Sequence, residues 1–116
     1  MHKTVKRYLI ENAEALFGKG ANLFEEEYSY ASGDSANLVF HLPPDKYVAV
    51  EVEVDVGKDD IAGLLQAIKY KYMFAVQERL LIDKVEGMLV ARSLHPSVKA
   101  WCSQYGIDYK EVPLDI

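Results

Sequence analysis

Residues 47–56 read Tyr47-Val48-Ala49-Val50-Glu51-Val52-Glu53-Val54-Asp55-Val56, and this stretch decides the fold. Side chains on a β-strand point alternately to the two faces of the sheet, so the five valines share one face. The other face carries the three acidic residues Glu51, Glu53 and Asp55. An all-valine face belongs in a core, and β-branched residues favour strands. The stretch therefore predicts one strand with a buried face and an acidic face.

The acidic face has two interpretations. Carboxylates at alternate positions lie about 7 Å apart along a strand and repel one another. A sheet tolerates such a row if water solvates it, or if a hard cation binds to the carboxylate oxygens. The alternation itself does not choose between a solvated edge and a metal site, so the rest of the chain has to decide.

Composition narrows the class of protein. The 116 residues are half hydrophobic and carry a formal net charge of −5, which predicts one domain over 1–116 and no strongly basic surface for non-specific DNA binding. Cys102 is the single cysteine and the three histidines are scattered, which argues against disulfides and a zinc cage. The N-terminal residues resemble an amphipathic helix rather than a signal peptide, and no run is long enough to span a membrane. We expect a cytoplasmic protein.

The hydrophobic periodicity predicts eight elements in the order αβββαβαβ. They are a helix over 3–17, strands over 23–30, 37–42 and 47–56, a helix from about 61, a strand over 85–91, a helix over 96–105 and a strand over 107–112. Three meandering strands followed by a βαβ crossover imply an α/β fold with a mixed sheet flanked by helices.

The helical spacing also predicts which side chains are buried. In the helix from about 61, the expected buried stripe is Ile61, Leu65, Ile68, Tyr72 and Ala75. In the helix over 96–105, we expect Val98, Trp101 and Cys102 to point inward. The charge run Glu25-Glu26-Glu27 is expected to be solvated.

Polar residues on three predicted elements converge on one place. Asn37 precedes Glu51 by 14 residues across a hairpin, so the two lie on neighbouring strands. Gln66 and Tyr70 are four residues apart on the following helix, and therefore lie on one face of it. Together they form a constellation, Asn37, Glu51-x-Glu53 and Gln66-x-x-x-Tyr70.

This constellation and the element order resemble the PD-(D/E)XK nuclease superfamily, which has the restriction-endonuclease-like fold. The similarity is to the branch with a Gln-x-x-x-Tyr helix motif, which includes RecB-type exonucleases and small endonucleases that cut branched or mismatched DNA. The segments that match are Ala36-Asn-Leu-Val-Phe40, Val48-Ala-Val-Glu-Val-Glu53, Leu65-Gln-Ala-Ile-Lys-Tyr70 and Val85-Glu-Gly-Met-Leu-Val-Ala91. The resemblance covers nearly the whole chain and implies a DNA endonuclease that hydrolyses phosphodiester bonds with Mg²⁺ or Mn²⁺.

The chain departs from the superfamily at two positions. Asn37 lies where the superfamily has a metal-binding Asp, and Glu53 lies where it has a catalytic Lys. The resemblance implies metal binding by Asn37, Glu51 and Glu53, with Gln66 and Tyr70 in positioning roles. Glu53 or Lys69, with Lys58 as a further alternative, would orient or deprotonate the attacking water. The alternative is a catalytically inactive nuclease-fold module that binds nucleic acid or a protein.

The expected partners follow from the same resemblance and from composition. The implied substrate is DNA, branched or single-stranded forms included. A nuclease core of this size usually dimerises or accompanies another DNA-binding domain. Eight tyrosines in 116 residues exceed what so small a core needs, and exposed apolar patches mark interfaces. We therefore expect a homodimer.

Overall fold

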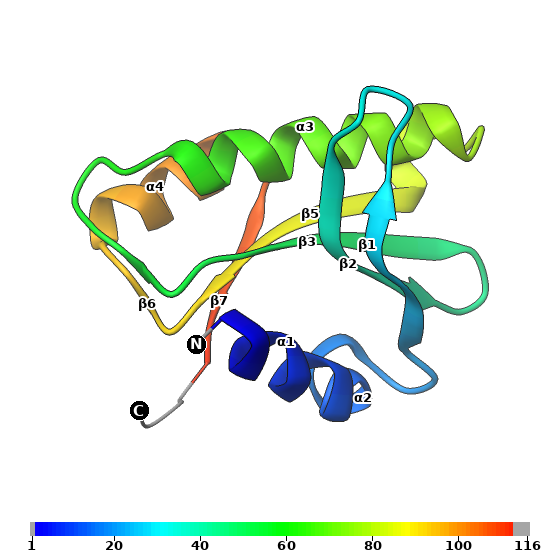
Figure 1. The fold of residues 1–116 in the computed structure, drawn as a ribbon, viewed down its shortest axis with the longest axis horizontal. Coiled ribbons are helices and arrows are strands. Elements are labelled where there is room, and N and C mark those ends of the chain that lie inside the picture. The colour runs from blue at the N-terminus through cyan, green and yellow to red at the C-terminus, as the bar shows by residue number, and fades with distance from the viewer. Residues whose placement is uncertain (1, 113–116) are drawn as a thin grey trace.

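A five-stranded mixed sheet lies between two layers of helices in the computed structural model, which describes residues 2–112 (Figure 1). The elements are α1 (His2–Glu11), α2 (Ala13–Phe17), β1 (Asn22–Ser29), β2 (Ser35–Leu42), β3 (Lys46–Val52), β4 (Asp55–Val56), α3 (Ala62–Gln77), η1 (Ile82–Lys84), β5 (Val85–Ala91), β6 (Ser93–Leu94), α4 (Pro96–Gln104) and β7 (Asp108–Glu111). The predicted α/β class and the αβββαβαβ order are confirmed. The first helix is divided at Asn12, and two short strands, β4 and β6, are added.

The strand order is β1-β2-β3-β5-β7. β1, β2 and β3 form an antiparallel meander, whereas β5 pairs parallel with both β3 and β7. Parallel neighbours need a crossover connection, and the helices α3 and α4 provide the two crossovers. The strand that carries Glu51 is therefore central, with β2 on one side and β5 on the other.

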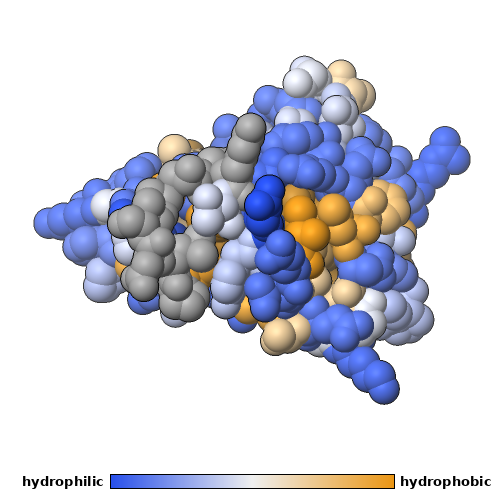
Figure 2. Space-filling view, turned by 60° about the horizontal axis from the view of Figure 1, so that its bottom comes forward, coloured by the Kyte–Doolittle hydropathy of each residue, from blue (hydrophilic) through white to orange (hydrophobic). Residues whose placement is uncertain are grey.

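The valine face of β3 packs as predicted. Val48, Val50 and Val52 are buried in one cluster with Val5 and Leu9 of α1. Figure 1 shows α1 and α2 on this side of the sheet and α3 on the other. Figure 2 looks toward the α1 side, where a hydrophilic surface surrounds a small hydrophobic area. The helix thus removes the β-branched face from water, which is the main stabilising contribution of such a strand.

The predicted strand over 47–56 is wrong beyond Val52. The backbone N–H of Glu53 still donates to Val90 O at 2.8 Å, but Val54 O then accepts from the N–H of Arg92 at 2.8 Å. β4 and β6 form a separate two-stranded sheet. Asp55 pairs there with Arg92 and accepts a hydrogen bond from Ser93 Oγ at 2.8 Å. Asp55 therefore leaves the acidic face, because the chain after β5 offers both a new strand partner and a counter-charge.

The predicted burial of the two later helices is wrong in part. Ile61, Leu65 and Tyr72 are 37%, 56% and 54% exposed. The buried side of α3 consists instead of Gly63, Leu64, Ala67, Tyr70, Phe74 and Ala75. α3 is apolar on two sides, so periodicity cannot predict which side faces the sheet. The side with small residues is buried because it permits the closer approach to the sheet.

Val98 and Cys102 of α4 are buried as predicted, but Trp101 is 39% exposed and stacks on Tyr105.

Candidate active site

Three polar side chains lie in a row across β1, β2 and β3. Leu38 pairs with Val50, so the next positions along the two strands place Asn37 beside Glu51. Asn37 Oδ1 accepts a hydrogen bond of 2.7 Å from the backbone N–H of Val52. Glu27 on β1 completes the row, since Asn37 hydrogen bonding contributes to its lowered pKa. The predicted meeting of Asn37 and Glu51 is confirmed.

Glu51 is a half-buried carboxyl group among other carboxylates. Burial, together with the negative charges of Glu53 and Glu27, raises its pKa to about 8. Loss of water and like charge both disfavour ionisation. In the absence of a cation, much of Glu51 is therefore protonated at neutral pH.

Gly63 determines where the Glu53 side chain lies. A Cβ atom on Gly63 would stand 3.1 Å from Glu53 Cγ and 2.9 Å from Leu89 Cδ1. A methyl group does not fit in this space without displacing its neighbours. The glycine in the first turn of α3 thus lets Glu53 lie between the helix and β5.

Tyr70 brings α3 to the same region, and Gln66 lies four residues before it on the helix. Tyr70 is buried and stacks on Tyr30, with ring centroids 5.3 Å apart. Burial raises the pKa of Tyr70, and the nearby Glu51 carboxylate is the next contribution. Within residues 2–112, the buried side-chain oxygen that lacks a hydrogen-bond partner is Gln66 Oε1. A buried acceptor without a partner lowers the stability of the fold, unless a bound group such as a cation or water interacts with it.

Of the two predicted lysines, Lys69 lies near Tyr70 but is paired with Asp34. Lys69 Nζ is 2.8 Å from Asp34 in the turn between β1 and β2. Hydrogen bonding to Asp34 raises the Lys69 pKa, with burial opposing it and the Asp34 and Tyr70 charges assisting. Lys58 is exposed in the segment before α3. Neither lysine is among the charges that shift the pKa of Glu51.

Sequence reasoning missed two residues of this site: Glu27, which belongs to the row, and Lys6, which lies beside it. Glu25, Glu26 and Glu27 are exposed as predicted, but Lys6 Nζ lies 2.8 Å from Glu26 and 2.8 Å from Glu27. The register of β1 shifts between Leu23 and Glu25, and Glu27 has a φ of 51°. A charge run gives no sign of which of its residues adopts an unusual backbone conformation.

The donor set is chemically suited to a hard divalent cation. It comprises the carboxylates of Glu51 and Glu53 and the amide oxygens of Asn37 and Gln66. In the described part of the chain, no three histidine, cysteine, aspartate or glutamate side chains form a group that could hold a metal ion. A cation here would depend on the amides as well as on two carboxylates. The unsatisfied Gln66 oxygen and the raised pKa of the half-buried Glu51 are the observations that fit it.

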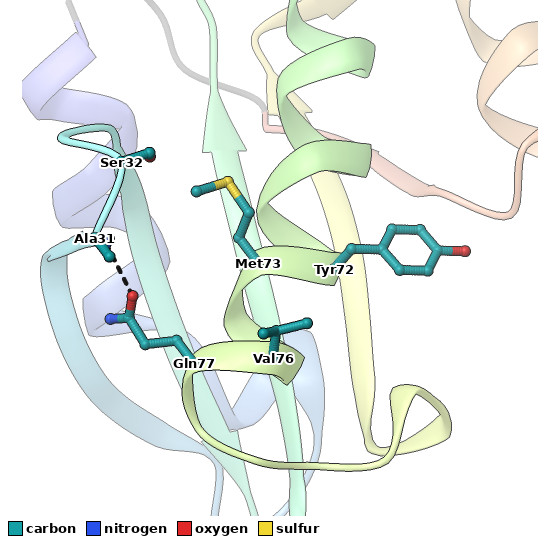
Figure 3. Close-up of a pocket in the computed structure, with 6 residues that line it drawn as sticks. All are labelled: Ala31, Ser32, Tyr72, Met73, Val76 and Gln77. Atoms are coloured by element: carbon teal, nitrogen blue, oxygen red, sulfur yellow. Dashed lines mark hydrogen bonds between the residues drawn. The ribbon is translucent and has the colours of Figure 1, made fainter.

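A separate pocket of about 400 Å³ lies beside the second half of α3 (Figure 3). Its lining is Ala31, Ser32, Tyr72, Met73, Val76 and Gln77. Gln77 closes one side, where its Oε1 accepts a 3.0 Å hydrogen bond from the N–H of Ala31. None of the acidic residues lines this pocket, so it is distinct from the site.

A family model described as the Endonuclease NucS C-terminal domain matches residues 2–115. The chain belongs to this family. No curated protein matches the chain. The match spans all the site residues discussed above, so these side chains belong to the NucS C-terminal domain itself.

Solved structures agree with this membership. An EndoMS–dsDNA2 complex has a TM-score of 0.75 at 20% identity, covering 96% of this chain and 44% of that one. EndoMS in its apo form has a TM-score of 0.76 at 19% identity, covering 100% and 48%. A repair endonuclease from Pyrococcus abyssi has a TM-score of 0.73 at 16% identity, covering 97% and 47%.

These likenesses establish the restriction-endonuclease-like fold of this NucS C-terminal domain. The chain spans less than half the length of the three solved chains. Assignment to the Gln-x-x-x-Tyr branch stays a prediction. Fold does not imply function, so activity has to be argued from the residues of the site.

Proposed function

We propose that this chain is a DNA endonuclease domain that hydrolyses phosphodiester bonds with Mg²⁺ or Mn²⁺ at the acidic row. The observation that carries the proposal is the half-buried Glu51 carboxyl, with its raised pKa, beside Glu53 and Asn37. A carboxyl whose pKa is raised by burial and like charge gains most from a bound cation. Membership of an endonuclease domain family supports the same reading.

Glu51, Glu53 and Asn37 are the proposed metal ligands. Glu51 and Glu53 would lose their mutual repulsion when the cation binds. A bound Mg²⁺ or Mn²⁺ would supply Lewis acidity at the scissile phosphate and lower the pKa of water.

The chain's own side chains would direct the hydrolysis. Glu53 accepts a proton from the attacking water, since a carboxylate serves as general base within hydrogen-bond reach. Tyr70 keeps its proton, because its pKa is raised by burial and by Glu51, and it therefore donates to the DNA strand. Gln66 positions the same strand. Lys69 is the alternative group for orienting water, if it leaves Asp34.

DNA is the proposed partner, in duplex, branched or single-stranded form. One matched EndoMS structure is a dsDNA complex, which supports duplex DNA as the first substrate to test. With a net charge of −5, the chain has no general basic surface, so contacts around the site would have to provide the binding.

A second candidate is a NucS-family module that binds DNA, or a protein, without cutting. The uncharged Asn37 favours it, because its oxygen already accepts from Val52 and brings no charge to a metal. Both nearby lysines are also engaged, Lys6 with Glu26 and Glu27 and Lys69 with Asp34.

The chain is also proposed to be a homodimer. Leu65, Tyr72 and Val76 expose apolar surface on α3, and Val76 is 78% exposed. Such surface is typical of interfaces. No helix in the described part of the chain is long and apolar enough to cross a membrane. A cytoplasmic location stays a prediction.

The deciding experiment is a nuclease assay with Mg²⁺ or Mn²⁺ on single-stranded, duplex and branched DNA. The wild type is expected to cut at least one substrate, and Glu51→Gln to lose about 100-fold in rate, since residues that only orient a metal's ligands already contribute roughly 10- to 100-fold. Gel-shift binding in EDTA runs alongside. Binding without cutting under all conditions would favour the second candidate, and neither binding nor cutting would reject both DNA functions.

A further inference from the structure

A buried lysine from α1 enters the edge of the acidic row. Among residues whose burial is described, the buried charged residue is Lys6, which is 7% exposed. Its Nζ lies 2.8 Å from Glu26 Oε2 and 2.8 Å from Glu27 Oε1. A buried ammonium is costly unless it is well paired, so both carboxylates are required partners.

Glu27 is held in an unusual backbone conformation. Its φ of 51° lies in the left-handed region, which a non-glycine residue rarely adopts inside a strand. The surrounding structure must maintain such strain, and strained residues cluster at functional sites. Lys6 binds one carboxylate oxygen, and the hydroxyl of Ser35 donates to the other at 3.2 Å.

Glu27 is connected to the row through Asn37. Burial raises the pKa of Glu27, but hydrogen bonding and charge from Lys6 outweigh it, and Ser35 and Asn37 assist. Asn37 directs its oxygen to the N–H of Val52 at 2.7 Å, so its NH₂ group is the one available to Glu27. Lys6, Glu27, Asn37 and β3 are therefore linked in one chain of polar contacts.

We propose that Lys6 is a positioning residue of the acidic site, which neutralises Glu27 and holds that carboxylate against the Asn37 amide. The cation site is then left with Glu51, Glu53 and a correctly oriented amide oxygen. Without Lys6, the charge of Glu27 would join the site, and the Asn37 amide would lose its fixed partner. The inference rests on the proposed function, because it assigns a role within that site.

The test is Mn²⁺ affinity, measured by electron paramagnetic resonance of free Mn²⁺. Lys6→Met should tighten Mn²⁺ binding roughly fivefold, because the charge of Glu27, no longer neutralised, then acts on the site. Lys6→Arg should stay within about twofold of wild type, since it keeps the charge. Glu27→Gln, which leaves Lys6 paired with Glu26, should weaken binding roughly fivefold.

A matched pair separates the site role from a structural one. Lys6 contacts Glu26 and Glu27 at equal distance, and hydrogen bonding from Asn37 acts on Glu27. Lys6→Met should have no effect on affinity in a Glu27→Gln background and its full effect in a Glu26→Gln background. Equal effects in both backgrounds, or a lowered melting temperature with unchanged Mn²⁺ affinity, would overturn the proposal.

A second readout keeps the inference independent of metal binding. The side-chain NH₂ signals of Asn37 in a ¹⁵N spectrum should move in Lys6→Met and Glu27→Gln but not in Glu26→Gln. If the wild type binds no Mn²⁺, the proposed function fails, and these signals still decide whether Lys6 orients Asn37. Unmoved Asn37 signals in Lys6→Met would reject the positioning role.

Discussion

Gly63 and Glu53 are in such close contact that a Cβ atom on the glycine would lie 3.1 Å from Glu53 Cγ. The same atom would lie 2.9 Å from Leu89 Cδ1, so a side chain at 63 must displace one of two neighbours. Leu89 is fully buried, whereas Glu53 is half-buried, so the carboxylate is the group that would move.

Gly63→Ala is therefore expected to weaken Mn²⁺ binding several-fold while stability changes little. Alanine gains about 1 kcal/mol of helix propensity over glycine, which offsets part of the steric cost. Isothermal calorimetry and thermal denaturation give the two quantities. Gly57→Ala is the matched control, because nothing lies within 4 Å of a Cβ there. Unchanged affinity in Gly63→Ala would show that Glu53 is not a ligand.

The pH dependence of stability should report Glu51. Its pKa is raised from the ordinary 4.5 to about 8, first by burial and then by Glu53 and Glu27. Between these two values the folded protein holds a proton that the unfolded chain has lost. The free energy of unfolding should therefore fall as pH rises from about 5 to 8, by at most about 1.4 kcal/mol per pH unit.

Glu51→Gln should remove this slope, so that the variant equals wild type near pH 5 and exceeds it near pH 8. Urea denaturation in EDTA at several pH values measures the difference. Carboxylates with a lowered pKa, such as Glu27 and Asp55, change the stability at lower pH. They are present in both proteins, so their contribution cancels in the comparison. Parallel pH profiles would show that Glu51 ionises normally.

Divalent cations should stabilise the wild type at pH 8. A ligand at 100 times its dissociation constant adds about 2.7 kcal/mol, which raises the melting temperature by several degrees in a domain of this size. Glu51→Gln should lose most of the rise, and Glu26→Gln should keep it. Differential scanning calorimetry with Mg²⁺, Mn²⁺ and EDTA checks this. If the melting temperature of the wild type is the same under all three conditions, the protein has no such metal site.

The sequence was sufficient where two patterns agreed. Alternation in residues 47–52 identified the buried valines and the facing Glu51, because strand geometry leaves no other arrangement. The 14-residue hairpin spacing placed Asn37 beside Glu51. β5 was predicted with its observed bounds, Val85–Ala91, since a short apolar run suits a central strand.

Where the sequence failed, the deciding contact came from a distant segment. α3 is apolar on two sides, and Gly63 and Ala67 face the sheet because they are small. β3 ends at Val52 because Asp55 pairs with β6 in a second sheet and forms an ion pair with Arg92. Lys6 and Glu27 are 21 residues apart, and neither periodicity nor spacing indicates that their side chains meet.

The proposed homodimer should depend on the exposed side of α3. Light scattering at tens of micromolar is expected to give twice the monomer mass, and Val76→Lys to shift it toward the monomer by charging an apolar surface. Val76 is 78% exposed, so the substitution leaves the core intact. Ser103→Lys adds the same charge to an exposed position of α4. A monomeric wild type would reject the dimer, and equal effects of both lysines would reject α3.

The two departures from the superfamily pattern can be reversed together. Asn37→Asp alone puts a carboxylate beside Glu27 and Glu51 and loses the NH₂ group that contacts Glu27, so it should destabilise by about 1–2 kcal/mol. Glu53→Lys places a positive charge beside Glu51, which should lower the Glu51 pKa and compensate for the added aspartate.

The double variant should create or enhance Mg²⁺-dependent cleavage in the assay on single-stranded, duplex and branched DNA. Adding Glu51→Gln should abolish that gain. If the folded double variant cuts none of these substrates, and wild type shows no metal-dependent stabilisation, the row is not a latent nuclease centre, and the DNA- or protein-binding module is the function to pursue.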